Sequence, residues 1–157
     1  MSEAATERDI IAILTPIPNG KVLASLCAVN GVSGQVIETS AGAFAVLDDT
    51  SPGAADKAAE AVSTFAKGHP VLALERRAGQ ITVAKWEDGA RTGTLPPGLA
   101  LDQAPGAITS LLTGTQTIDE LAATHPDKVY SARVGRIKAL RELRRLAKQA
   151  KKQQSGG

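Results

Sequence analysis

QVIETSAGAFAVLD, residues 35–48, contains two β-forming runs around one turn and decides the fold class. The runs are residues 35–39 and 43–48, and Ser-Ala-Gly at residues 40–42 separates them. Short runs rich in Val, Ile, Thr and Phe on either side of a glycine-bearing loop predict a β-hairpin. We therefore expect two antiparallel strands that lie side by side in a sheet.

A helix and a second hairpin are expected next along the chain. Ser51 provides the N-cap and Pro52 the first residue of a helix that continues over residues 54–67, because both residue types are favoured at those positions. Gly68 ends this helix, and its apolar stripe consists of Ala58, Ala61, Val62 and Phe65. The second hairpin has strands at residues 71–75 and 80–86, on either side of Arg77-Ala78-Gly79.

The first thirty residues permit two interpretations. Residues 2–14 predict a short helix, because Thr6 and Asp9 have capping-box spacing before apolar residues at helical period. Residues 21–29 fit a helix or a strand, and we favour a strand because turn residues bracket this short run. The fold class is then α+β, with a single antiparallel sheet of about five strands and covering helices. In the alternative, the first apolar run is a strand and residues 21–29 are a helix. This gives the ferredoxin-like order βαββαβ with one extra strand.

Residues 89–106 are rich in Pro and Gly, which predicts a linker or a strap across the surface. This interpretation places an α+β body at residues 1–88 and a helical basic region at residues 107–157. Thr117 and Glu120 form a capping box within that region. The elements expected there are two short helices over residues 107–113 and 118–124, and a long basic amphipathic helix over residues 128–153.

The charges of the 157-residue chain are strongly segregated, although its formal net charge is only +2. Residues 131–157 contain nine Lys and Arg side chains and one acidic residue, which gives this segment a net charge of +8. Residues 1–130 have a net charge of −6. Such asymmetry indicates an acidic partner for the C-terminal segment, either another molecule or the chain's own body.

On a helical wheel the C-terminal segment has one face of Leu and Ala and one face of cations. The candidate nucleic-acid-binding residues are Arg133, Lys138, Arg141, Arg144, Arg145, Lys148, Lys151 and Lys152. These side chains can neutralise backbone phosphates. Because the cations run along the whole segment, a helix-turn-helix that reads bases is not favoured. The main hypothesis is a non-enzymatic protein that binds nucleic-acid backbone with little sequence preference.

The alternative hypothesis is a protein adaptor or assembly factor, whose tail docks on an acidic protein surface or on a second copy of the chain. Leu140, Leu143 and Leu146 recur every three residues and form no sustained heptad, so a long coiled coil is not expected, and a homodimer through a short antiparallel contact stays open. Membrane insertion is not expected, because the apolar face lacks Trp and Phe. The acidic N-terminus does not resemble a secretory signal, and we expect a cytoplasmic protein.

Few residues indicate chemistry, and we expect neither enzyme activity nor a cofactor or metal. His69 and His125 lack metal-ligand spacing, and Cys27 is expected to be a small buried side chain. Asp48 and Asp49 form the one acidic cluster suited to Mg²⁺, although they also suit the start of a helix. With two Phe, one Trp and one Tyr, the chain is not expected to stack several bases. Trp86 is expected at a covered sheet edge.

Overall fold

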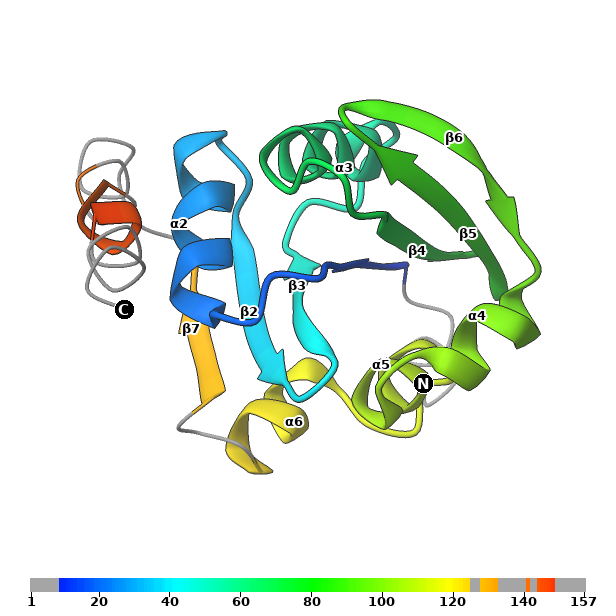
Figure 1. Ribbon diagram of the computed structural model, residues 1–157. Helices are drawn as coiled ribbons and strands as arrows, with labels where there is room; N and C mark the ends of the chain where they lie inside the picture. Colours follow the sequence, from blue (N-terminus) through cyan, green and yellow to red (C-terminus); the bar gives the residue numbers. More distant parts are fainter. Residues whose placement is uncertain (1–8, 125–127, 133–140, 142–143, 149–157) are drawn as a thin grey trace.

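The computed structural model describes residues 9–124, 128–132, 141 and 144–148. Within these residues a single antiparallel sheet has the strand order β6-β5-β4-β1-β3-β2-β7 (Figure 1). The α+β class is confirmed, but the sheet has seven strands rather than about five. The strands are β1 (Ile10–Leu14), β2 (Gly34–Thr39), β3 (Gly42–Leu47), β4 (Val71–Arg77), β5 (Gln80–Glu87), β6 (Ala90–Leu95) and β7 (Val129–Ser131). The helices with labels are α2 (Gly20–Val29), α3 (Ala54–Phe65), α4 (Pro97–Gln103), α5 (Gly106–Leu112) and α6 (Ile118–Thr124).

The four central strands and their two connecting helices follow the alternative order, βαββαβ, with the ferredoxin-like strand order β4-β1-β3-β2. A helix was predicted over residues 2–14, and this prediction is wrong at residues 10–14. Ile10–Leu14 is instead the strand β1, which lies between β3 and β4. Ile11, Ala12 and Ile13 are fully buried. A strand buried on both faces has a continuous apolar run, and a run of five residues also satisfies helical spacing.

The strand favoured for residues 21–29 is also wrong, because these residues lie in α2. Asn19 is the N-cap, and its Oδ1 accepts hydrogen bonds from the backbone N–H groups of Lys21 and Val22 at 2.9 and 3.3 Å. Asn is among the preferred N-cap residues, because its side chain satisfies amide groups that have no partner within the helix. Leu23 and Leu26 of this helix are buried against the sheet.

Both predicted hairpins are confirmed. β2 and β3 pair from Gly34↔Leu47 to Thr39↔Gly42, and β4 and β5 pair from Val71↔Trp86 to Arg77↔Gln80. The helix between the hairpins is also confirmed, but it begins at Ala54 after a left-handed Gly53 (φ 89°) rather than at Ser51 and Pro52. The predicted stripe is wrong at Phe65, whose side chain is 47% exposed at the end of α3.

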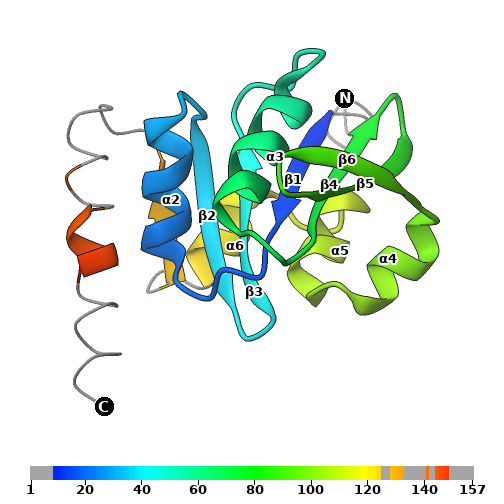
Figure 2. The same cartoon turned by 45° about the horizontal axis from the view of Figure 1, so that its top comes forward.

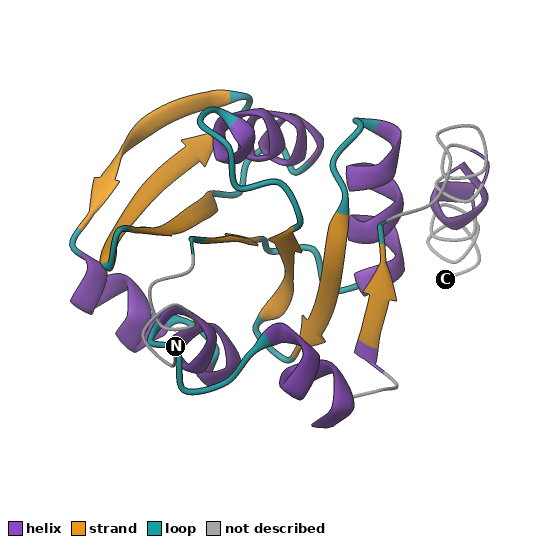
Figure 3. Ribbon diagram, turned by 180° about the vertical axis from the view of Figure 1, so that it is seen from behind, coloured by secondary structure: helices purple, strands orange, loops and turns teal. Residues whose placement is uncertain are grey.

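Helices cover both faces of the sheet (Figures 1 and 3). α2 and α3 pack on one face, where the buried residues include many small side chains. α4, α5 and α6 pack on the other face, where Phe44, Leu74, Ile108 and Leu112 are buried. The core therefore consists of two layers, one on each side of the central strands.

Residues 89–106 contain two elements that the sequence did not predict. β6 extends the sheet beyond β5, with a register shift between Lys85 and Trp86, and α4 follows it. Residues 90–94 are exposed, so the sequence of β6 lacks the alternation of apolar and polar residues by which a strand is predicted. By contrast, the predicted helices at 107–113 and 118–124 are confirmed as α5 and α6.

The predicted helix over residues 128–153 is wrong at its start. Residues Val129–Ser131 form β7, which pairs with β2 through Val36↔Tyr130. The described residues further along, 141 and 144–148, are helical. Figures 1 and 2 show the turn at residues 144–148 beside α2, on the outer side of that helix. The other residues of the predicted helix lie outside the described part of the chain.

Candidate functional site

Four of the eight predicted nucleic-acid-binding residues lie in the described part of the chain. Arg141, Arg144, Arg145 and Lys148 are all exposed, and Leu146 between them is half-buried. Arg144 and Lys148 are four residues apart in one helical turn, so their side chains lie on the same face. The remaining four predicted residues, which lie outside the described residues, are Arg133, Lys138, Lys151 and Lys152.

The basic segment is attached to the sheet at its N-terminal end. Ala132 is 2% exposed, and its backbone N–H donates to the carbonyl of Gly34 at 2.9 Å. Tyr130 packs against α2, where a Cβ atom on Gly20 would overlap its ring. The Gly20 N–H donates to Glu38 Oε2 at 2.8 Å. β7 therefore fixes the point at which the cationic part of the chain leaves the body.

A pocket of about 410 Å³ lies at one end of the sheet, between β1, β3 and the α5–α6 segment. Its apolar lining comes from Ile10, Val46, Leu47, Leu111 and Ile118. Its polar lining comes from Asp9, Asp48, Thr50, Gln116, Thr117 and Asp119. Among the described residues, the lining combines three carboxylates with an apolar part and contains no Lys, Arg or His side chain.

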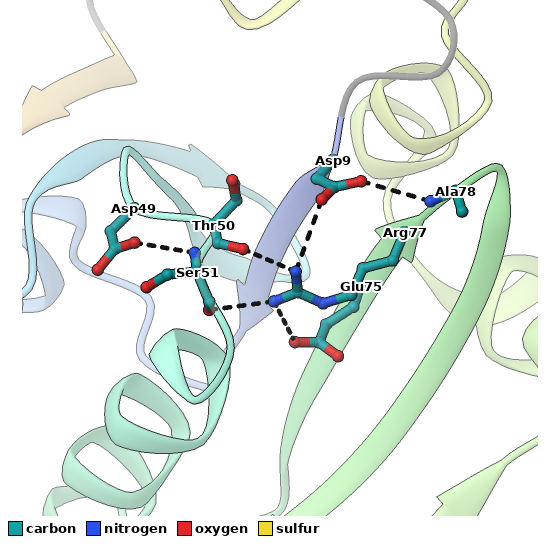
Figure 4. Close-up of polar contacts among 7 residues, drawn as sticks. All are labelled: Asp9, Asp49, Thr50, Ser51, Glu75, Arg77 and Ala78. Carbon is teal, nitrogen blue, oxygen red and sulfur yellow. Dashed lines mark hydrogen bonds and ion pairs between the residues drawn. The ribbon is translucent and has the colours of Figure 1, made fainter.

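Arg77 contacts two of the residues that line this pocket, Asp9 and Thr50 (Figure 4). Its Nη1 donates to the Thr50 carbonyl at 2.7 Å, and its Nη2 donates to the Ser51 carbonyl at 3.1 Å. The same guanidinium forms ion pairs with Asp9 at 3.6 Å and Glu75 at 3.5 Å. These contacts connect the loop before α3 to β4 and to the start of β1, and they offset part of the negative charge of Asp9.

The N-terminal end of α6 forms one wall of this pocket. Thr117 Oγ1 accepts from the Glu120 backbone N–H at 3.1 Å, and Glu120 Oε1 accepts from the Thr117 backbone N–H at 3.3 Å. This reciprocal pair is the predicted capping box. It places Asp119 in the first turn of α6, where the helix dipole favours a negative charge.

Asp48 and Asp49, which form the predicted acidic cluster, have different surroundings in the structure. Asp48 is exposed and lines the pocket. Asp49 accepts from the Ser51 backbone N–H at 2.9 Å, and hydrogen bonds from Ser51 lower the pKa of the Asp49 carboxyl. Among the described residues, no group of three or more His, Cys, Asp or Glu side chains is arranged to hold a metal ion. Asp49 thus orders the loop before α3.

Cys27 and Trp86, two other residues singled out in the sequence, are buried side chains of the core. Cys27 is 2% exposed, and its burial raises the pKa of the thiol to about 12, so the thiol stays protonated at neutral pH. Trp86 is 7% exposed and packs in the α2–α3 layer, so its predicted cover is confirmed. The predicted edge position is wrong, because β5 pairs with both β4 and β6. His69 is exposed in the loop after α3, and His125 lies outside the described residues.

The pocket was not predicted, although Asp48 was named as a candidate. Asp9, Asp48 and Asp119 are far apart in sequence and meet through the pairing of β1 with β3 and the packing of α6. The Thr117–Glu120 capping box was the one local signal, because it fixes where α6 begins.

Comparisons with known proteins provide no indication of function for this chain. No protein family model matches the chain, and no curated protein or solved structure is significantly similar to it. None of the helices in the described residues is long and apolar enough to span a bilayer.

Proposed function

We propose that this protein is a non-enzymatic binding protein whose basic C-terminal segment binds the phosphate backbone of nucleic acids with little sequence preference. The observation that carries the proposal is the net charge of +8 over residues 131–157, on a body of net charge −6. Phosphate contacts supply the sequence-independent part of nucleic-acid affinity, and clustered Lys and Arg provide them.

The exposure of the described cations supports this proposal. Arg141, Arg144 and Lys148 are exposed and helical, so their charged groups are accessible to solvent. A phosphate chain therefore meets a cationic face rather than isolated surface charges.

The attachment of the segment also supports the proposal. Ala132 is the last described residue before the basic segment and is buried in the α2–α3 layer. The acidic charges belong to the body, where they repel a polyanion. A polyanion is therefore expected to bind along the tail and not across the sheet.

Charge removal in the full-length protein tests the proposal. The tail variant combines Arg141→Gln, Arg144→Gln and Lys148→Gln, and its control combines Lys21→Gln, Lys67→Gln and Arg91→Gln, which are exposed body residues. Affinity for a fluorescent single-stranded oligonucleotide and a duplex is measured by anisotropy in about 0.05 M salt. We expect the tail variant to bind each at least about tenfold more weakly than the control.

Two results would overturn the proposal. One is equal binding by the tail variant and the control, which would place the contact outside the three cations. The other is the absence of binding by the unmodified protein at low salt, where electrostatic binding is strongest.

A further inference from the structure

We infer that the outer side of α2 is a docking surface for the helical turn at residues 144–148 of the same chain, and that Leu146 positions the cations of this turn. This role rests on the proposed function and deepens it, because it explains how the body holds the segment that binds a polyanion. It belongs to uncharged side chains rather than to further cations.

α2 is buried on its outer side as well as against the sheet. Its residues from Leu23 to Ala28 are all buried, and six consecutive helical residues point in every direction around the helix axis. The residues of α2 that pack in the layer on the sheet are Leu23, Ala24, Leu26 and Cys27. At 100° per residue Ser25 points about 180° away from the middle of this set, yet it is only 6% exposed. A second layer therefore covers the outer side of α2.

α3 lies in the same layer and has the exposure that is typical of an outer helix. Ala58 and Val62 are buried, whereas Asp56, Lys57 and Glu60 between them are exposed. The middle of α2 contains no exposed residue. The two helices pack on the same face of the sheet, so the difference comes from what lies over α2 and not from the sheet.

The turn at residues 144–148 is the described segment that lies over α2. Figures 1 and 2 both show it beside α2, on the side away from the sheet. Leu146 in this turn is half-buried. Beyond Lys21, the side chains that α2 directs away from the sheet are small or apolar, namely Ser25, Ala28 and Val29. Such a surface lets a second helix approach closely and forms a groove for a larger side chain. α2 contains no acidic residue, so the contact is apolar and not an ion pair.

This contact supports a helix that its own charges destabilise. Arg144 and Lys148 are four residues apart, and like charges at this spacing oppose helix formation. Short helices are also only marginally stable in water without tertiary packing. With Leu146 against α2, both cations point within about 20° of the opposite direction, at 100° per residue. Docking therefore holds the turn helical and presents both cations to solvent, where they are exposed. Cations that are ordered in advance lose less conformational entropy when they bind a polyanion.

Amide hydrogen exchange of the full-length protein, without nucleic acid, tests the docking. Leu146→Gln removes the apolar contact and keeps every charge, whereas Ser25→Arg places a long cationic side chain beneath the turn. We expect each variant to lower the exchange protection of the amides at residues 144–148 by at least about tenfold. The control Leu99→Gln makes the same change at a residue of α4 that is 52% exposed, and it is expected to leave these amides unchanged.

Oligonucleotide affinity tests whether docking positions the cations. Leu146→Gln has the net charge of the control Leu99→Gln. We expect it to bind a fluorescent duplex about fivefold more weakly, because the cations of an undocked turn must be ordered on binding. Ser25→Arg is also expected to bind more weakly than the unmodified protein, although it adds a positive charge. A Leu146 that only stabilised the fold would leave the affinity of the folded protein unchanged.

Docking is contradicted if the amides at residues 144–148 of the unmodified protein exchange as fast as those of an unfolded peptide, or if both variants retain full protection. It is also contradicted if protection rises with protein concentration, because Leu146 would then contact a second copy. Equal duplex affinity of Leu146→Gln and Leu99→Gln overturns the positioning role. The proposed function fails through a different result, the absence of binding by the unmodified protein, which the exchange measurement does not share.

Discussion

The two faces of the sheet are covered in different ways, and the described pocket lies on the side of the shorter helices. α2 and α3 have ten and twelve residues, and they cover one face with small buried side chains such as Ala58 and Ala59. α4, α5 and α6 have seven residues each, and the pocket opens beside α5 and α6. No residue of α2 or α3 lines the described pocket, whereas the short helices place polar ends and loop residues beside it.

The largest loss of stability is expected where the chain crosses one end of the sheet, and not within either layer. Gly42 has a φ of +123°, and a Cβ atom there would overlap the carbonyl oxygen of Thr15. Gly42→Val combines a disfavoured backbone conformation with a clash against main chain. We expect it to lower the free energy of unfolding by more than about 4 kcal/mol, measured by urea denaturation. A loss below about 1 kcal/mol would show that the turn adapts.

A matched pair of truncations compares the two layers directly. Leu23→Ala removes a fully buried side chain from α2, and Leu111→Ala removes a buried side chain that also lines the pocket. The first leaves a closed cavity, whereas the second extends an existing opening to solvent. We expect losses of about 4 kcal/mol and about 2 kcal/mol, within the range for such changes. Equal losses in the free energy of unfolding would mean that side chains pack as tightly beside the pocket as they do under α2.

Enlargement of side chains tests the same difference in the opposite direction. Ala59 is fully buried in the α2–α3 layer, whereas Ile118 is half-buried and lines the pocket. Ala59→Leu is expected to destabilise the protein by about 1–3 kcal/mol through overpacking, and Ile118→Phe by less than about 1 kcal/mol. Thermal unfolding of both variants measures the difference. A larger loss of stability for Ile118→Phe than for Ala59→Leu would show that the pocket cannot accommodate the larger side chain.

The effect that is smallest at neutral pH concerns the protonation of Cys27 in the α2–α3 layer. Burial raises the pKa of its thiol to about 12 from an ordinary value of 9.0, so the folded protein retains a proton that the unfolded chain loses. Above pH 9 this group is expected to reduce stability by at most about 1.4 kcal/mol per pH unit, and it has no effect below pH 8. Cys27→Ala removes this part of the pH dependence. An identical alkaline profile for both proteins would contradict the assignment.

Local signals were sufficient for the hairpins, for α3 and for α6. The run at residues 35–48 was interpreted correctly because its turn and both strands are contiguous in sequence. The Thr117–Glu120 capping box likewise places all of its hydrogen-bonding partners within four residues. Where the partners are neighbours in the chain, residue types and spacing contain the needed information.

The remaining elements depend on partners that are distant in sequence. Val129–Ser131 forms a strand because β2 offers an edge more than ninety residues earlier, and residues 10–14 form one because β3 and β4 lie on either side. The pocket has the same origin, since Asp9, Asp48 and Asp119 meet only after the sheet has assembled. The segregation of charge was visible in the sequence, whereas the acidic site on the body required the fold.

The most direct test of the central claim compares duplex DNA binding by the full-length protein with binding by a shortened chain that ends at Ala132. This end point keeps β7 and the buried Ala132, so the sheet is left intact. The account predicts that the full-length protein binds with an affinity that falls as salt rises, with a logarithmic slope of about −0.9 per phosphate contacted, and that the shortened chain does not bind. Equal binding by the two proteins, or binding by neither, would contradict it.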